Sequence, residues 1–387
     1  MKQEKKQGFV LWLLSFMKRE IVFTIALILA ILSCFLTHPS KDYISYIDFR
    51  VLSLLFCLMA VVNGLSKLGV FHKLGIGLLQ RTKTTKSLYI ALVYLCFFTS
   101  MLITNDVALL TFVPFTILVL SMAGKGSELT FLVIMETIAS NLGSMLTPLG
   151  NPQNLYLYTI SEMQLGDFVL TLLPYSLLSL ILLTLILLFH KSEPVNIAHT
   201  DSLTASEYEF HTGRFVMYLI LFIICLLVVL HILPFYVMLG IVVAAVLIFD
   251  RKTIITVDYI LLLTFIWFFI FIGNMKQLPA VNSLLSGMIT GHEFAGGILI
   301  SQLISNVPAA ILISGFTDAI SPLLIGINVG GLGTLIASMA SLISYKLYCK
   351  TKDSNSLHYI ALFTLYSLIF LACLILEYVC LTHFHIH

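Results

Sequence analysis

The sequence ITNDVA at residues 103–108 decides the fold, because it places three polar residues, one of them ionisable, inside otherwise unbroken apolar sequence. A second stretch, LISNVPA at residues 303–309, repeats the order of a hydroxyl residue followed by asparagine between two apolar segments. Two such interruptions in corresponding halves of a membrane protein indicate broken helices near the bilayer midplane, where secondary transporters bind substrate and coupling ion. The pair therefore predicts a transporter.

The composition supports a membrane location. Of the 387 residues, 59% are hydrophobic and 10% are charged, with a mean hydropathy of +1.03, whereas soluble domains are about 25% charged. The formal net charge of +2 gives no reason to expect a nucleic-acid partner. Seven single cysteines lie mostly in apolar segments without metal-site spacing, and we interpret them as core residues.

Apolar segments long enough to cross a bilayer predict nine crossings. They lie at about residues 21–36, 49–66, 129–160 (interrupted), 168–189, 214–232, 235–249, 258–273, 323–345 and 358–382. Two more apolar segments, 87–122 and 293–316, are each divided by a polar tip without a hydrophilic loop. Each is predicted to form a re-entrant helical hairpin that enters and leaves on one side. Two full crossings in place of a hairpin would give the same topology.

The basic residues predict the orientation in the cell membrane. With the N-terminus in the cytoplasm, eighteen of the 21 Lys and Arg residues fall inside, and only Lys41, Arg50 and Lys276 fall outside. The C-terminus then lies outside. Residues 1–20 lack a cleavage site for a signal peptide and are expected to form a cytoplasmic or interfacial segment.

The two halves are related by an internal repeat. An offset of 201 residues aligns Asn105 with Asn306. An offset of 187 aligns three further pairs, Asn141 with Asn328, Gly143 with Gly330 and Thr147 with Thr334. The charge pattern starts the first unit outside and the second inside, so the repeats are predicted to be inverted.

The expected fold class is an all-α polytopic membrane protein with two inverted repeats, each containing a re-entrant hairpin and a broken transmembrane helix. The expected divisions are a cytoplasmic or interfacial segment at 1–20, a first transmembrane helix and outer loop at 21–48, the first repeat at 49–189, a cytoplasmic linker at 190–213, connecting helices at 214–257 and the second repeat at 258–387.

Helix breaks supply the chemistry that binds ions. Glycine, proline and asparagine interrupt any helix between Ser140 and Asn154, and Asn151 and Pro152 are expected to cap and open its continuation. Three glycines interrupt the matching segment at 328–334. Free N–H groups at helix N-termini favour an anion, and carbonyls of unwound chain favour Na⁺.

The candidate site follows from these breaks. Thr104, Asn105 or Asp106 at the first tip, and Ser305 or Asn306 at the second, are expected to cap free N–H groups. The expected substrate and ion ligands are Thr104, Asn105, Asp106, Asn141, Gly143, Thr147, Asn151, Ser305, Asn306, Asn328, Gly330 and Thr334. Na⁺ is expected at Asn105, Asp106 and Gly143 and at Ser305 and Asn306. The alternative is that these side chains only satisfy the broken backbone.

Asp106 and Glu136 are acidic residues at membrane depth, and both are candidates for coupling. An unpaired buried charge is costly, so each is expected to be protonated, paired or bound to a cation. Glu136 shares a helix face with Ser140 and Gly143 and either lines the same cavity or acts as a structural partner of a hairpin residue.

These residues resemble the ion transporter superfamily, which includes divalent-anion/sodium symporters, citrate carriers, arsenite permeases and D-type sodium/proton antiporters. The similarity extends from about residue 49 onward. Thr104-Asn105-Asp106 is similar to the Thr-Asn-Asp motif of the arsenite-permease branch, and Ser305-Asn306-Val307 keeps two members of a Ser-Asn-Thr motif. The resemblance implies that tips and breaks bind anion and Na⁺, and that the protein is a homodimer working by an elevator motion.

The expected function is secondary transport of an inorganic or carboxylate anion, coupled to Na⁺ or H⁺ by alternating access. A Na⁺/H⁺ antiporter is the first alternative, and an anion channel is the second. No HExxH, GxSxG, paired intramembrane aspartates or nucleotide-binding loop is present, so neither an enzyme nor ATP drive is expected. No cofactor other than the coupling ion is expected.

Overall fold

The computed structural model describes residues 17, 20–37, 41, 43–79, 82–161, 163–194, 210–352 and 354–383. This part of the chain is helical, with no β-strand, and the predicted all-α polytopic class is confirmed. The α-helices are α2 (Ile21–Leu36), α3 (Tyr43–Tyr46), α4 (Phe49–Lys67), α5 (Val70–Leu79), α6 (Thr85–Thr99), α7 (Asn105–Met122), α8 (Leu129–Ser144), α9 (Pro152–Ser161), α10 (Leu165–Leu188), α12 (Thr212–Val229), α13 (Phe235–Phe249), α14 (Arg251–Ile254), α15 (Tyr259–Lys276), α16 (Pro279–Ile289), α17 (Glu293–Ile304), α18 (Asn306–Ser314), α19 (Ile320–Val329), α20 (Met339–Tyr348) and α21 (Ser356–His383). Two 3₁₀ helices, η1 (Gly126–Glu128) and η2 (Leu335–Ala337), precede α8 and α20.

Six of the described helices are long and apolar enough to cross a membrane by length and composition: α4, α7, α10, α12, α15 and α21. Shorter apolar helices, among them α2, α6, α13, α17 and α19, accompany them. Helix α7 has 18 residues, so its length does not itself distinguish a hairpin arm from a full crossing. It packs against α6, so the two helices form a helical hairpin, and the re-entrant course of this hairpin in a bilayer stays a prediction.

The order of elements is the same in the two halves. A long helix (α4 or α15) leads into a short one (α5 or α16), a helical hairpin (α6–α7 or α17–α18), a broken helix (α8–α9 or α19–α20) and a final long helix (α10 or α21). Both first helices begin with the same cap. The Asp48 carboxylate accepts the Val51 N–H at 2.9 Å, and the Asp258 carboxylate accepts the Leu261 N–H at 2.9 Å.

Corresponding residues begin the corresponding helices. The second hairpin arms start at Asn105 and Asn306, which are offset by 201 residues. The helices after the breaks start at Pro152 and Met339, which are offset by 187. The offsets read from the sequence therefore describe a real repeat of helix boundaries.

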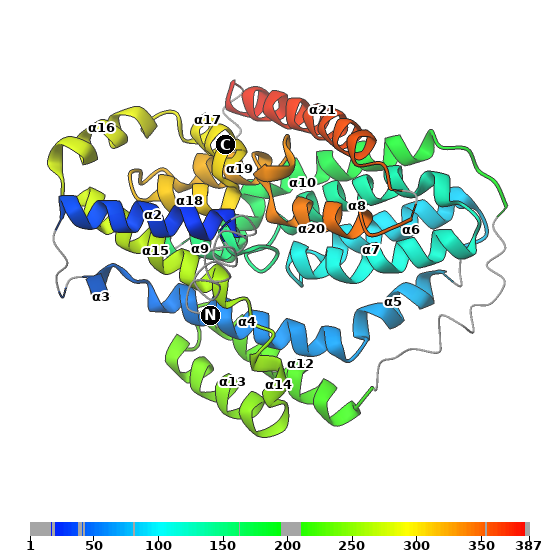
Figure 1. Ribbon diagram of the computed structural model, residues 1–387, viewed down its shortest axis with the longest axis horizontal. Helices are drawn as coiled ribbons and strands as arrows, with labels where there is room; N and C mark the ends of the chain where they lie inside the picture. Colours follow the sequence, from blue (N-terminus) through cyan, green and yellow to red (C-terminus); the bar gives the residue numbers. More distant parts are fainter. Residues whose placement is uncertain are drawn as a thin grey trace, which may run out of the picture.

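Each hairpin packs against the broken helix of the other half as well as its own. Helix α6 packs along α8 and α17 along α19, while α7 contacts α20 and α18 contacts α9. In Figure 1 the hairpin α6–α7 occupies the right-hand part of the view and α17–α18 the left-hand part. Inversion of the repeats relative to a bilayer stays a prediction.

Glycines allow the hairpins to approach the broken helices closely. A Cβ atom on Gly143 would lie 2.1 Å from the Phe97 carbonyl oxygen, and one on Gly330 would lie 2.8 Å from the Ile298 Cα. These two pairs also correspond under the offsets of 187 and 201. A side chain at either glycine would separate a hairpin from its broken helix.

Several helices are not among the crossings predicted from the length of the apolar segments. Helices α5 and α16 are too short to cross a bilayer and follow the first long helix of each half. The first interruption is shorter than expected, because α8 continues to Ser144 and α9 begins at Pro152. The second lies further along the chain than the expected 328–334, because α19 continues to Val329 and α20 begins only at Met339. Most of the predicted interfacial segment at 1–20 and of the linker at 190–213 lies outside the described residues.

Candidate functional site

The first hairpin tip is bound to the first helix break. The Asn105 N–H donates to the Gly150 carbonyl at 2.9 Å, and its Nδ2 donates to Asn141 Oδ1 at 3.1 Å. The Ser140 hydroxyl donates to the Asn105 carbonyl at 3.1 Å. The backbone and side chain of Asn105 are therefore both satisfied by α8 and the segment that follows it.

Asn141 joins the two halves. Its Nδ2 donates to Ser341 Oγ at 3.0 Å, and its Oδ1 accepts from Ser338 Oγ at 3.0 Å. Ser338 precedes the first residue of α20, and Ser341 lies in its first turn. The start of α7, the end of α8 and the start of α20 thus meet at one amide.

A second asparagine set joins the halves at the start of α9. Asn151 Nδ2 donates to Asn328 Oδ1 at 3.3 Å, and Asn328 Nδ2 donates to Asn154 Oδ1 at 2.7 Å. The Asn154 N–H donates to Asn151 Oδ1 at 2.8 Å. The predicted cap of α9 by Asn151, with Pro152 as first helical residue, is confirmed.

The second hairpin tip lies against the second break. Ser305 has φ +76° and ψ +155°, a conformation that residues with a side chain rarely adopt. Its hydroxyl donates to the Ala337 carbonyl at 3.4 Å. The Asn306 amide lies beside Gly331, where an added Cβ would be 2.9 Å from Asn306 Nδ2. The two tips therefore differ in backbone geometry, although each has a hydroxyl residue followed by asparagine.

Two side-chain amides replace the backbone partners that the breaks remove. Asn154 Nδ2 donates to the carbonyls of Met145 at 2.8 Å and Thr147 at 3.1 Å. Gln302 Nε2 donates to the carbonyls of Gly330 and Leu332, both at 2.8 Å, and its Oε1 accepts the Thr334 N–H at 3.0 Å. These contacts stabilise unwound chain that would otherwise leave polar groups unsatisfied at membrane depth.

Sequence reasoning missed Gln302, Ser338 and Ser341. The sequence offered two signals for these residues. Gln302 is a polar residue four positions before Asn306, and Ser338 and Ser341 are hydroxyl residues that follow the second break. Asn154 lay inside the predicted break but was not among the expected ligands. The contacts of these four residues depend on tertiary packing between distant segments, which the sequence alone does not give.

The remaining expected ligands have separate surroundings. Of the expected caps, neither Thr104 nor Ser305 makes a side-chain capping bond within the described residues. At the first tip it is Asn105, one of the three residues expected there, whose Oδ1 accepts the Asp106 N–H at 3.0 Å. The Thr147 hydroxyl donates to the Met101 carbonyl, and Thr334 is exposed.

The two acidic residues also differ. Asp106 is partly exposed, and within the described residues its carboxylate has no hydrogen-bond or ion-pair partner. Glu136 is fully buried, and its Oε1 accepts a hydrogen bond from the Thr116 hydroxyl of α7. That bond joins α8 to the first hairpin, which is the structural role considered from the sequence.

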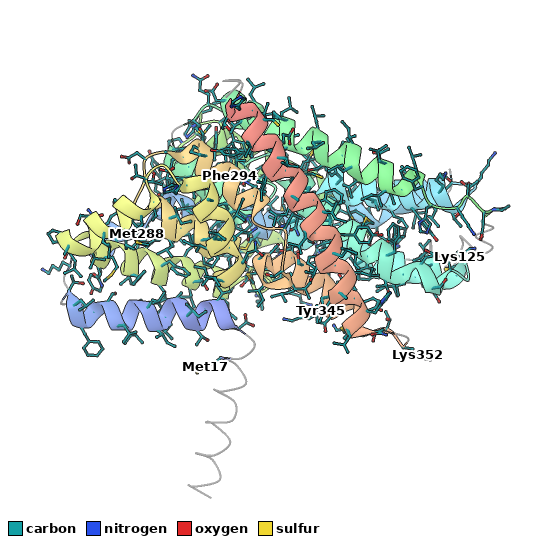
Figure 2. All side chains as sticks on the ribbon, turned by 90° about the horizontal axis from the view of Figure 1, so that it is seen from above. Met17, Lys125, Met288, Phe294, Tyr345 and Lys352 are labelled. Carbon is teal, nitrogen blue, oxygen red and sulfur yellow. The ribbon has the colours of Figure 1, made fainter. Side chains whose placement is uncertain are left out.

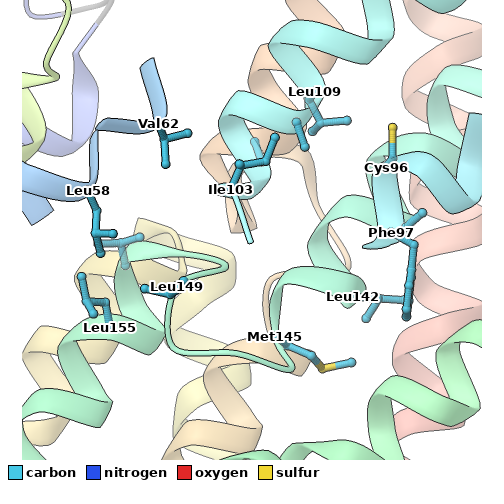
Figure 3. Close-up of a cluster of buried hydrophobic side chains, with 14 of the residues drawn as sticks. Leu58, Val62, Cys96, Phe97, Ile103, Leu109, Leu142, Met145, Leu149 and Leu155 are labelled. Carbon is cyan, nitrogen blue, oxygen red and sulfur yellow. The ribbon is translucent and has the colours of Figure 1, made fainter. Parts of the chain in front are cut away.

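The N-termini of α7, α9 and α20 meet around these asparagines, and the N-terminus of α18 lies against the second break, where Ser305 bonds to Ala337 just before α20. Backbone dipoles give helix N-termini a partial positive charge, so their meeting favours negative charge between them. Apolar side chains surround the meeting point. Figure 3 shows Ile103 before α7 and Leu149 in the first break beside Leu58 and Val62 of α4, all four of them buried.

Paired hairpins and broken helices that converge on one buried polar cluster define the architecture of a membrane transporter. Comparison with known families agrees, since the family model described as "Citrate transporter" matches residues 9–343. The chain belongs to this citrate transporter family.

Similar proteins include several named as transporters. The "uncharacterized transporter MJ0456" of Methanocaldococcus jannaschii is 33% identical over 305 residues, covering 78% of this chain and 81% of that protein. The "inner membrane protein YbiR" of Escherichia coli is 31% identical over 327 residues, covering 82% and 84%. The "silicon efflux transporter LSI3" of Oryza sativa subsp. japonica is 34% identical over 137 residues, covering 35% and 27%.

Proposed function

We propose that this transporter carries a small anion, an inorganic oxyanion or a carboxylate, and couples it to Na⁺ or H⁺ by alternating access. The observation that carries the proposal is the meeting of the N-termini of α7, α9 and α20 at the buried asparagines Asn105, Asn141, Asn151 and Asn328. Each of these side chains is at most 7% exposed.

The chemistry of this cluster favours an anion of small size. None of the hydrogen-bonding residues described around the two breaks is a lysine or arginine, so the attraction would come from backbone dipoles and amide N–H donors. Such donors suit a compact anion with several acceptor oxygens. The family description and the name of the silicon efflux relative are compatible with a carboxylate or an oxyanion.

Coupling would arise from Asp106 and the unwound carbonyls. An ionised Asp106 beside an anion site repels the anion, so binding requires that Na⁺ or H⁺ neutralise it first. Asn154 donates to one lone pair of the Met145 carbonyl and Gln302 to one lone pair of the Gly330 carbonyl. The second lone pair of each of these two carbonyls is available to a cation. The expected Na⁺ positions beside Asn105, Asp106 and Gly143 and beside Ser305 and Asn306 fit this scheme.

A cation/proton antiporter is the second candidate, favoured by the Asp106 carboxylate, which is partly exposed and has no partner within the described residues. In an antiporter, Na⁺ and H⁺ would compete for this carboxylate, and no anion would be needed. Ion-driven anion uptake separates the two functions, because only the symporter accumulates the anion.

The test is uptake by proteoliposomes across a panel of oxyanions and carboxylates, under imposed Na⁺ or pH gradients. Asn105→Ala and Asn306→Ala should each abolish uptake while leaving membrane insertion intact. Asn63→Ala, which removes a hydrogen bond from α4 to the Thr256 carbonyl outside the site, serves as the control. Normal uptake by both tip variants would contradict the proposed site.

We also propose a homodimer in the cell membrane with the N-terminus inside and the C-terminus outside. Apolar side chains exposed on α10, α12, α13 and α21 are available to lipid or to a second copy. Light scattering of detergent-solubilised protein measures the mass, and a monomeric mass would contradict the dimer.

A further inference from the structure

A cavity of about 550 Å³ lies apart from the transport cluster, between the C-terminal part of α7, the start of α8 and the end of α20. Its walls combine cationic, hydroxyl and apolar side chains. The cationic groups are Lys350 and Lys352, and the apolar wall includes Ile117 and Leu347. Figure 2 shows Lys352 at the same end of the molecule as Lys125, opposite Met288.

The two lysines are available to a ligand. Both are exposed, and within the described residues neither has an ion-pair or hydrogen-bond partner. Two acidic residues described near this end are already engaged, because Glu193 pairs with Lys125 and Glu128 accepts from His190 at 2.8 Å. Asp353, next to Lys352 in the sequence, lies outside the described residues. The described lining of the cavity therefore carries two positive charges and no carboxylate.

The contact between Glu193 and Lys125 also affects the pKa of the Glu193 carboxyl. The hydrogen bond and charge of the Lys125 ammonium hold the pKa of the Glu193 carboxyl below its usual value. Glu193 is therefore ionised at neutral pH, with its charge beside the Lys125 ammonium group.

The polar floor of the cavity is fixed by hydrogen bonds. Thr130 Oγ1 and the Tyr348 hydroxyl are 2.9 Å apart, and the Tyr348 hydroxyl also accepts the Asn355 N–H at 3.0 Å. Ser121 on the opposite wall is exposed and has no hydroxyl partner within the described residues. The lysines and Ser121 thus present donors over a rigid floor.

We propose that this cavity binds the phosphate headgroup of an anionic phospholipid. The Lys350 and Lys352 ammonium groups contact the phosphate, Ser121 donates to it, and Ile117 and Leu347 contact the glycerol and upper acyl chain. Basic pockets between helices at the cytoplasmic face suit such headgroups, and the positive-inside pattern places these lysines on that face. A free phosphate would leave the apolar wall uncovered, so the shape favours the lipid.

The test uses the full-length protein in an uncharged detergent. Dioctanoyl phosphatidylglycerol, dioctanoyl phosphatidylcholine and inorganic phosphate are titrated separately, and binding is followed by native mass spectrometry and by the melting temperature. The variant is Lys350→Gln with Lys352→Gln. The matched control is Lys83→Gln with Lys191→Gln, two exposed lysines that do not line the cavity.

We expect phosphatidylglycerol, and not phosphatidylcholine, to bind the wild type. Loss of two surface lysines should weaken that binding about 30-fold, and the control pair should leave it unchanged. Equal phosphatidylglycerol binding by wild type and by the Lys350/Lys352 variant would overturn the proposal. Phosphate binding as strong as lipid binding and equally dependent on the two lysines would overturn it in favour of a free-anion site.

Discussion

Asn151 and Asn328 lie 177 residues apart in the chain and are joined by a hydrogen bond of 3.3 Å from Nδ2 of the first to Oδ1 of the second. Asn151 caps α9 of the first half, and Asn328 lies in the last turn of α19 of the second. The hydrogen bond therefore joins the break of one half to the break of the other.

This bond predicts coupled stability. Asn151→Ala and Asn328→Ala should each lower the melting temperature, because each leaves a buried amide unpaired at a cost of about 1–3 kcal/mol. The double variant should lose less than the sum, with a coupling of about 0.5–3 kcal/mol. Thermal unfolding in detergent measures all three. The control is the double variant of Asn151→Ala with Asn63→Ala, two distant residues whose losses of stability should add. If the losses of Asn151→Ala and Asn328→Ala also added, the coupling would be contradicted.

The positive φ of Ser305 predicts that glycine is tolerated better than serine at the second tip. Backbone strain of this kind costs about 1–3 kcal/mol, and Ser305→Gly should release it and raise the melting temperature. The matched residue Thr104 has φ −49°, so Thr104→Gly should lower stability by adding freedom to the unfolded chain. Equal losses in the two variants would show that Ser305 is unstrained.

Asp106→Asn tests the coupling carboxylate. The substitution keeps the shape and removes the titratable charge, so the variant should bind anion with weakened dependence on Na⁺ and pH while losing concentrative transport. Binding and uptake in proteoliposomes under imposed gradients measure both effects. Unchanged ion-driven accumulation would assign coupling to oxygens around Asn105, Gly143 and Asn306 instead.

Gln302 should be needed for the second break. In Gln302→Leu two carbonyls lose their donor and the Thr334 N–H loses its acceptor, each at about 1–3 kcal/mol if buried and unsatisfied. Amide hydrogen exchange at residues 330–334 should accelerate and the melting temperature should fall. Gln164→Leu, at an exposed position before α10, is the control. Unchanged exchange would mean that water replaces the side chain.

The predicted orientation can be tested at described positions. In a background in which the exposed Cys380 is replaced, Lys191→Cys should label only from the cytoplasm and Lys276→Cys only from outside. Sided labelling of intact cells with a membrane-impermeant maleimide gives the answer. Reaction of both from one side would contradict the inverted repeats.

The sequence predicted the elements whose signals are local. Asn105 and Asn306 start their helices as the offset requires, and Asn151 with Pro152 opens α9 because capping and proline preferences act over a few residues. Which distant residues form hydrogen bonds with one another could not be predicted in the same way. Asn141 bonds to Ser341, 200 residues away, and Gln302 bonds to the second break across a tertiary contact. Short helices such as α5 and α16 also lack the length on which the crossings were assigned.

The bonds between the halves have a consequence for biosynthesis. A ribosome delivers the first repeat to the membrane long before Asn328 and Ser341 have been translated. Until then Asn141 and Asn151 lack their partners from the second half, and lipid offers no replacement. The nascent first repeat must therefore keep its break near water or the insertion machinery. A chain truncated before Asn328 should be an obligate substrate of membrane quality control.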